Sequence, residues 1–411
     1  MITGRTDNGL QYAVKKSGAS VAYCSLSIRC GTRNEEGYHG GIAHFVEHTI
    51  FKGTSHRSAA VINNYLDKLG GELNAFTTKE EIVFHATVLK EDLKKAADLL
   101  FELAVCPTFP ENEINVEKGV VIDEIQSYKD SPSEDIYDKF EELLFKGHPL
   151  SGNILGTKAS VRKITRNELL KFVKEQFRPS RMAFSIVADI DEKIMEKYVL
   201  KLSEKHFPRL VSEEDNGQPG SSATPSAAPF DITLNKRNHQ ANCIIGGLAP
   251  SLYEDRERLA TVLLCNILGG PANNSILNAV LREKNGWVYG VECSYTQYAD
   301  TGIVAISLGC DKNNLDKCVK AIYKEIGKLQ EEPLSERKLK AAKKQLLGQM
   351  AISGDNGETQ CLSMGKGLLA YGKLNSGKET RQMVEGITAE DIREMAQRIF
   401  DTGKLSKLTY I

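Results

Sequence analysis

Residues 41–49 read Gly-Ile-Ala-His-Phe-Val-Glu-His-Thr, a stretch apolar enough to predict a buried helix. On a helix, positions i and i+4 lie one turn apart on the same face, so His44 and His48 can bind one ion through their imidazoles. Glu47 borders that face. A hydrolytic zinc site needs this set of groups, because zinc lowers the pKa of bound water to about 7 and a nearby carboxylate takes its proton. The alternative interpretation is a histidine cluster satisfied inside a protein core.

A second helix-like stretch offers a third ligand. Residues 117–125 read Glu-Lys-Gly-Val-Val-Ile-Asp-Glu-Ile, which places Glu117 and Glu124 seven residues apart and therefore on one helix face. Acidic side chains within an apolar run are costly to bury unless they bind a metal or form hydrogen bonds. The pattern favours a metal site formed by both helices, although spacing alone does not decide whether Glu124 is the ligand.

The elements around these helices recur in the second half of the chain. In residues 20–104, the pattern predicts a strand, two helices, a glycine turn, two strands and another helix, and residues 242–329 repeat this order with similar lengths. The expected strands are 20–29, 72–77, 82–88, 183–188, 242–248, 287–295, 302–308 and 407–411. The expected helices are 40–51, 59–69, 91–104, 111–129, 133–144, 255–268, 275–284, 315–329, 335–352 and 389–400. Hairpins without steady β-α-β alternation predict an α+β fold of two similar domains, each a mixed or antiparallel sheet with helices packed on one face.

Composition divides the chain between these halves. The 411 residues exceed what one core usually supports. Residues 211–229, VSEEDNGQPGSSATPSAAP, have the composition of a linker, since they offer almost no large apolar side chain to bury. We therefore predict an N-terminal zinc-binding catalytic domain over 1–210 and a homologous domain over 230–411. In the latter, Thr-Val-Leu-Leu-Cys at 261–265 replaces the histidine motif, so one zinc per chain is expected.

Charge and cysteine content exclude several classes of protein. The 53 basic and 54 acidic side chains leave a net charge of -1, which does not favour binding to nucleic acid or to an anionic membrane. The nine cysteines include no C-x-x-C pair and indicate buried free thiols in a reducing compartment. The first residues contain no apolar signal segment, and no run approaches the ~18 apolar residues that span a bilayer. A soluble cytoplasmic protein is expected, with a periplasmic location as the alternative if a leader has been removed.

The motifs resemble the pitrilysin/insulinase peptidases, or inverzincins, of the short two-domain type that includes the mitochondrial and bacterial processing peptidases. Family members carry H-x-x-E-H followed 76 residues later by a glutamate ligand, which is Glu124 here, and a supporting glutamate seven residues earlier, here Glu117. Residues 70–77, Gly-Gly-Glu-Leu-Asn-Ala-Phe-Thr, resemble the family's edge strand, which pairs with the substrate backbone. The resemblance therefore implies that Asn74 and Ala75 contact the substrate.

A motif in the second half extends the resemblance. Residues 281–289, Leu-Arg-Glu-Lys-Asn-Gly-Trp-Val-Tyr, are similar to the family's L-R-E-K-x-G-x-x-Y motif, whose Arg and Tyr bind the substrate near the scissile bond. The resemblance implies this role for Arg282 and Tyr289. Without it, Arg282 would be interpreted as a surface charge and Tyr289 as a strand core residue.

The resemblance also implies an activity and an assembly. In the family, four such domains enclose a chamber, and the Arg and Tyr that face a zinc come from the diagonally opposed domain. Short members assemble two chains, so a homodimer with Arg282 and Tyr289 acting in trans is expected. The predicted function is a Zn²⁺-dependent endopeptidase for peptides or short unfolded segments, with Glu47 as general base. The alternative is a non-catalytic or peptide-binding subunit of a heteromeric processing peptidase.

Overall fold

The computed structural model describes residues 1–207 and 228–411, and these form two compact units. The first unit contains Met1–Gln126, the described part of 152–217, and Ile352–Leu374. The second contains Ser127–Ser151, the described part of 218–351, and Asn375–Ile411. Apart from Ala228 and Pro229, the predicted linker lies outside the described residues.

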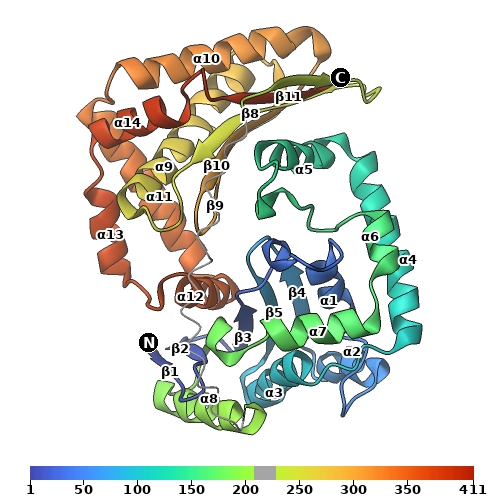
Figure 1. The fold of residues 1–411 in the computed structure, drawn as a ribbon. Helices are drawn as coiled ribbons and strands as arrows, with labels where there is room; N and C mark the ends of the chain where they lie inside the picture. The colour runs from blue at the N-terminus through green and yellow to red at the C-terminus, as the bar shows by residue number, and fades with distance from the viewer. Residues whose placement is uncertain (208–227) are drawn as a thin grey trace. The chain divides into compact units, whose positions relative to one another are not determined.

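The first unit is built on a six-stranded mixed sheet in the order β1-β2-β6-β3-β5-β4 (Figure 1). Its strands are β1 (Ile2–Arg5), β2 (Gln11–Lys16), β3 (Val21–Ile28), β4 (Glu72–Thr77), β5 (Ile82–Leu89) and β6 (Met182–Ala188). Only β2 and β6 pair in parallel. Strand β4, which carries the Asn-Ala segment, lies at one edge of this sheet.

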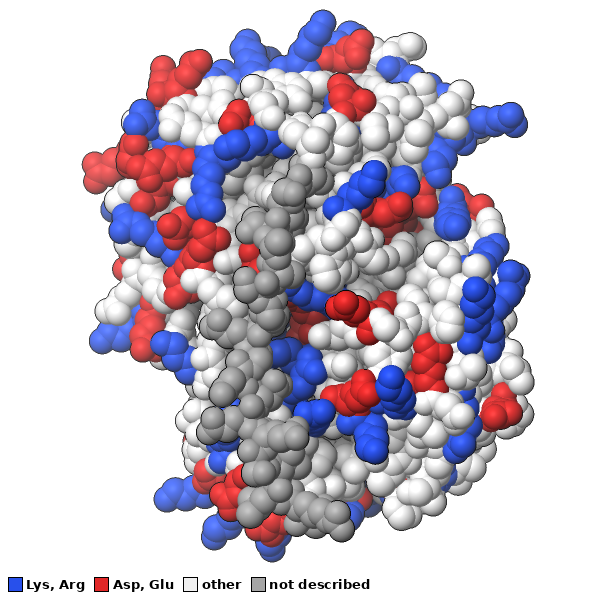
Figure 2. Space-filling view, viewed as in Figure 1, with Lys and Arg blue, Asp and Glu red and all other residues white. Residues whose placement is uncertain are grey.

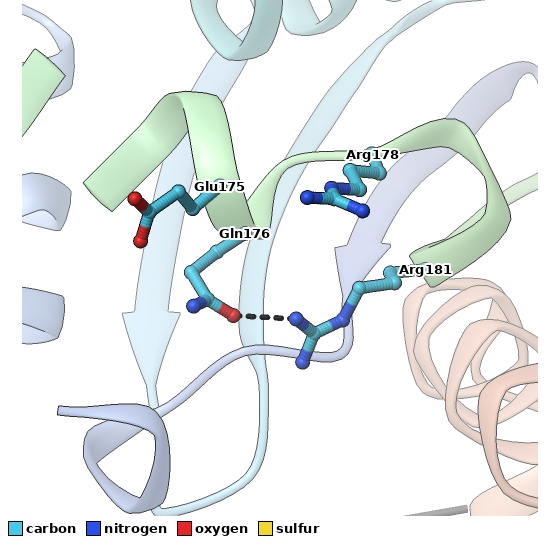
Figure 3. Close-up of a pocket in the computed structure, with 4 residues that line it drawn as sticks. All are labelled: Glu175, Gln176, Arg178 and Arg181. Carbon is cyan, nitrogen blue, oxygen red and sulfur yellow. Dashed lines mark hydrogen bonds between the residues drawn. The ribbon is translucent and has the colours of Figure 1, made fainter. Parts of the chain in front are cut away.

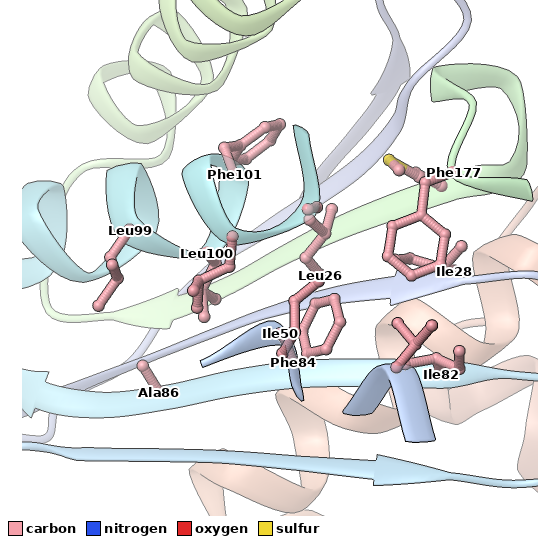
Figure 4. Packing of buried hydrophobic residues seen from close by; sticks show 14 of the residues in the cluster. Leu26, Ile28, Ile50, Ile82, Phe84, Ala86, Leu99, Leu100, Phe101 and Phe177 are labelled. Atoms are coloured by element: carbon pink, nitrogen blue, oxygen red, sulfur yellow. The ribbon is translucent and has the colours of Figure 1, made fainter. Parts of the chain in front are cut away.

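Helices cover one face of this sheet and enclose the main core. They include α1 (Ile42–Ile50), α2 (Ala59–Asp67), α3 (Leu93–Val105), the greater part of α4 (Glu111–Asp130), α6 (Lys158–Lys163), α7 (Arg166–Gln176) and α8 (Glu192–His206). Figure 4 shows Leu26 and Phe84 from the strands packed among side chains from the helices, such as Ile50 and Phe101. Burial of these large side chains supplies the hydrophobic stabilisation of the unit and fixes α1 against the sheet.

A helix from late in the sequence covers the other face of the same sheet. Helix α12 (Gly357–Tyr371) packs on β3 and β6, where Cys361, Met364 and Leu368 meet Ala183 and Val187. All seven residues of β6 are consequently buried. The prediction of helices on one face missed this element, although a continuous apolar run such as that of β6 is typical of a strand covered on both faces.

The second unit repeats the plan with a five-stranded mixed sheet in the order β7-β11-β8-β10-β9. Its strands are β7 (Asp231–Leu234), β8 (Ala241–Ala249), β9 (Val288–Gln297), β10 (Gly302–Cys310) and β11 (Ser406–Tyr410). One face packs against α9 (Asp255–Gly269), α10 (Leu315–Glu331), α14 (Ala389–Ile399), α13 (Gly377–Glu385) and the main part of α11 (Glu336–Gly354). The other face packs against α5 (Pro132–Leu144) through Ile136 and Phe140.

The predicted α+β class and the two similar sheets are confirmed. The expected strands agree with those observed to within one or two residues. The helix expected over 275–284 differs, because Asn278–Lys284 (η5) winds as a π-helix. The prediction also omitted several elements, which are β1, β2, β7, α6, α7, α8, α12 and α13.

Charge on one face of the molecule and the hydropathy of its helices can be described separately. On the face shown in Figure 2, basic and acidic side chains alternate without a large area of one sign. Within residues 1–207 and 228–411, none of the helices combines the length and apolar character needed to span a bilayer.

The Leu-Gly-Gly segment at the end of α9 generates a stability prediction. A Cβ on Gly269 would lie 2.7 Å from the backbone nitrogen of Cys293 in β9, whereas a Cβ on Gly327 within α10 would meet open space. Gly269→Ala should therefore lower the free energy of unfolding by about 1–3 kcal/mol through overpacking. Gly327→Ala, the matched control, should raise it by up to about 1 kcal/mol because alanine has the higher helix propensity. Calorimetry on both variants checks this, and equal effects would contradict the close approach of α9 to β9.

Candidate metal centre

Helix α1 presents the motif because its apolar side chains anchor it in the core. Ile42, Phe45, Val46 and Ile50 are fully buried against the first sheet and its helices. The intervening positions place His44 and His48 one turn apart, with ring centroids 4.6 Å from each other. His44 is buried and His48 is half-buried, so the histidine face lies at the boundary of the core.

Helix α4 brings two carboxylates to these imidazoles. Nε2 of His44 lies 3.7 Å from Oε2 of Glu124, and Nε2 of His48 lies 3.3 Å from the same oxygen. One ligand atom from each of His44, His48 and Glu124 can be chosen so that all lie within 4.8 Å of one another. Among the described residues this is the one group of at least three His, Cys, Asp or Glu side chains that could hold a metal ion. The sequence-predicted ligands are thus brought together.

The donor set fits a tetrahedral zinc ion. Ligand distances of about 2.0–2.2 Å around tetrahedral zinc correspond to separations of about 3.4 Å between donor atoms, close to the distances to Oε2 of Glu124. That oxygen is buried and has no hydrogen-bond partner, a costly state for a carboxylate unless a cation binds it. Burial, together with the nearby His48, lowers the pKa of His44 to about 3, so His44 is the neutral imidazole that a metal requires.

Glu117 holds the second histidine in place. Its Oε2 lies 3.2 Å from Nδ1 of His48. Its Oε1 forms an ion pair with Nζ of Lys52 at 2.7 Å. A carboxylate on Nδ1 fixes the tautomer that leaves Nε2 free for a metal. Sequence reasoning missed Lys52, although its position four residues after His48, one turn further along the chain, was available as a signal.

Glu47 lies at the same site and is the candidate for proton transfer. Burial raises the pKa of its carboxyl group, while the Thr77 hydroxyl and His48 act in the opposite direction. Thr77 is the last residue of the edge strand β4, so the end of that strand meets the metal-binding helix. A carboxyl group whose pKa moves toward neutrality suits general acid–base work.

Strand β4 leaves a main-chain edge beside this centre. Its residues pair with β5 on one side only, with Asn74 opposite His85, and the described part of the chain adds no strand on the other side. Asn74 is exposed and Ala75 is half-buried. His85 contacts Glu358 of α12 at 3.1 Å and lies outside the ligand group.

Arg282 and Tyr289 lie in the other compact unit. Arg282 is exposed on η5, and Tyr289 is 57% exposed on β9, the edge strand of the second sheet. The Tyr289 hydroxyl donates a hydrogen bond to Asp311 at 2.9 Å, and this bond raises the pKa of the tyrosine. The side chain predicted as a core residue without the family resemblance is therefore accessible.

Two hollows in the first unit differ in their relation to the metal centre. One of about 580 Å³ is lined by the loop after α1, including Lys52, and by the start of α4. The other, of about 380 Å³, is lined by Glu175, Gln176, Arg178 and Arg181 (Figure 3), and none of the predicted site residues lines it. Only the first therefore adjoins the residues that support His48.

The Glu117 contacts generate a prediction about metal affinity. Glu117→Gln removes the charge that pairs with Lys52 and fixes His48, so the dissociation constant for zinc should rise about 10- to 100-fold. Glu113→Gln, one turn earlier on α4 and half-exposed, is the matched control and should bind zinc like the original chain. Competition with a chromophoric chelator measures both. Equal affinities would show that Glu117 does not support the site.

Comparison with known proteins agrees with this geometry. The chain is 29% identical over 374 residues to an uncharacterized zinc protease of Bacillus subtilis, covering 91% of this chain and 89% of that protein. It is 29% identical over 378 residues to an uncharacterized zinc protease of Rickettsia felis, covering 92% and 89%. A crystal structure of a protease from Helicobacter pylori matches with a TM-score of 0.89 at 20% identity over 100% of this chain and 99% of that one, which supports the fold.

Family profiles match both halves of the chain. The profile of insulinase, peptidase family M16, matches residues 12–158 and contains the metal-binding group, and the profile of the peptidase M16 inactive domain matches residues 163–346. A sequence with both profiles in this order, and with the histidine pair and glutamate assembled in the first, is a peptidase of the insulinase family, M16.

Proposed function

We propose that the chain is a zinc-dependent endopeptidase that hydrolyses peptides or short unfolded segments. The observation that carries the proposal is the meeting of His44, His48 and Glu124 within 4.8 Å, with Glu47 on the same helix. When bound there, zinc supplies a Lewis acid for the scissile carbonyl and lowers the pKa of the attacking water. One such ion per chain follows because the described residues contain one such ligand group.

The protein's own residues divide the remaining work. Glu47 takes the proton of the attacking water and delivers it to the leaving amine, for which its raised pKa suits it. Glu117, held by Lys52, keeps His48 in one orientation. The substrate backbone pairs with the free edge of β4, and Asn74 and Ala75 contact the residues beside the cleaved bond. An extended peptide can satisfy this edge through its main-chain hydrogen bonds.

The second unit contributes substrate binding in this proposal. Arg282 and Tyr289 are exposed and belong to the unit that lacks the histidine motif. We place them at the zinc of a second copy of the chain, as the family resemblance implies, so that a homodimer encloses two equivalent sites in one chamber. The exposure of both side chains supports this, because neither is used by the core of its own unit.

A non-catalytic subunit is the less well supported alternative. A subunit without a metal would gain nothing from a buried carboxylate oxygen of Glu124 that has no hydrogen-bond partner and faces two histidines. It would also not need the contacts of Lys52 and Glu117 that hold His48. The full set of ligands and supporting residues favours the catalytic proposal.

Glu47→Gln is the direct test of catalysis. The amide cannot accept a proton, so kcat for a quenched fluorescent peptide should fall by at least about 10²- to 10⁴-fold while zinc content stays near one per chain. Elemental analysis measures the zinc, and Glu36→Gln, an exposed residue, is the charge-matched control. A chelator should abolish cleavage by the original chain.

Each outcome of this test bears on the proposal. Cleavage that survives Glu47→Gln would refute the role of Glu47, and cleavage that resists the chelator would refute metal dependence. An original chain that holds zinc but cleaves no peptide of the library would favour the subunit alternative.

The trans arrangement is tested by mixing two inactive chains. A Glu47→Gln chain and an Arg282→Ala/Tyr289→Phe chain each lack one half of every site in their own homodimers. Mixed dimers rebuild one intact site, so about a quarter of the original activity should return at equal concentrations, when half of the dimers are mixed. Mass spectrometry of the mixture verifies subunit exchange. Exchange without recovery would show that the site is not shared between chains in this way.

A further inference from the structure

Helix α1 begins without a capping side chain of the usual kind. Its N-cap is Gly41, in the left-handed region at φ 88°, and no side chain of that residue is available to accept from the first amides of the helix. Helix N-termini expose N–H groups that need acceptors, and Ser, Thr, Asp or Asn at the N-cap normally provide one. The acceptor here comes from elsewhere in the chain.

The carboxylate of Glu35 fills this place. Its Oε2 accepts a hydrogen bond from the backbone N–H of Gly41 at 2.8 Å, and its Oε1 accepts one from Ala43 at 2.9 Å. One side chain thus bridges the N-cap and the second residue of the helix. His44 follows directly after Ala43, so the backbone that carries the first ligand is held by this carboxylate.

No cation explains the burial of Glu35. Its exposed fraction is 9%, and within residues 1–207 and 228–411 it forms no ion pair with a lysine or arginine. A buried carboxylate without a cationic partner is costly, and the compensation available to this one is the pair of amides and the positive end of the helix dipole. Glu35 precedes this short helix, and its two hydrogen bonds hold the first residues of the helix in place.

The backbone around Gly41 packs closely against the segment that contains Leu155 and Gly156. A Cβ on Gly41 would lie 2.6 Å from the carbonyl oxygen of Leu155, and a Cβ on Gly156 would lie 2.3 Å from that of Gly40. The nine residues of α1 are too few for a stable isolated helix, so its contacts decide where it begins. Glu35 and this glycine contact fix the start of the helix, and with it His44.

We propose that Glu35 is a positioning residue of the metal centre, which sets the place of His44 through the N-terminus of α1. The inference rests on the proposed zinc site and adds a residue outside the H-x-x-E-H motif and outside the ligands. Loss of the two hydrogen bonds from Gly41 and Ala43 to Glu35 lets the first turn of α1 loosen. A ligand displaced by a fraction of an ångström binds the metal less well.

Glu35→Gln tests this with zinc itself as the probe. The amide retains one acceptor but points its NH₂ group at the other N–H, so the dissociation constant for zinc, measured by chelator competition on the full chain, should rise about 10-fold. Glu36→Gln makes the same substitution at the adjacent exposed position and should leave the dissociation constant unchanged. The melting temperature is measured with and without zinc, because a merely structural role lowers both values equally and leaves the dissociation constant intact.

The possible outcomes separate this inference from the proposed function. If the original chain binds no zinc, the proposed metal site itself fails. If the original chain and Glu35→Gln bind zinc equally, the metal site stands and the role of Glu35 is refuted. Should Glu35→Gln not fold, Glu35→Asp keeps the carboxyl group but is one methylene too short to bridge both amides. It should weaken zinc binding several-fold, and unchanged affinity would overturn the inference.

Discussion

The attachment of one short helix to the first sheet is the constraint on which the metal centre depends. Helix α1 has nine residues and cannot be stable alone, so its structure comes from the burial of Phe45, Val46 and Ile50 in the core. Because these side chains anchor the helix in the core, the orientation of its histidine face is fixed as well. His44 and His48 are therefore rigid for the same reason that the core is packed.

Buried carboxylates then refine this position, each with partners of its own. Glu117 pairs with Lys52 and contacts His48, whereas Glu35 accepts from backbone amides at the start of the same helix. Burial raises the pKa of Glu35 to about 8, although its two amide bonds oppose the shift. Because its pKa is raised, Glu35 contributes its full stability to the fold below about pH 4.5, and this contribution is lost as the pH rises toward about 8.

Sequence periodicity predicted much of the fold and the pairing of His44 with His48 for a physical reason, whereas the family resemblance singled out Glu124. Strands such as β3 and β5 alternate between core and second face, and the ligands on α1 and α4 follow helical spacing within one element. Contacts between elements far apart in the sequence could not be predicted from periodicity. Nothing local places α12 on the far face of the first sheet, and the pairing of Lys52 with Glu117 joins residues 65 positions apart. The roles of Asn74, Ala75, Arg282 and Tyr289 came from family resemblance and stay predictions.

The second unit shows what this helix becomes without its ligands. In α9, Thr261 and Cys265 are four residues apart, like the two histidines of α1, and both are buried. The Thr261 hydroxyl donates to the Glu257 carbonyl within its own helix at 2.7 Å, and Cys265 is a buried free thiol in the core cluster that also contains Cys293 of β9.

The Thr261 hydroxyl is satisfied within its helix and leaves no orphaned oxygen for a cation, unlike Glu124 in the first unit. The same packing plan can therefore retain its fold while it loses the metal, because the core positions of the helix and its ligand positions are separate. In this second unit, Tyr289 is exposed on the edge strand β9 and takes no part in the core.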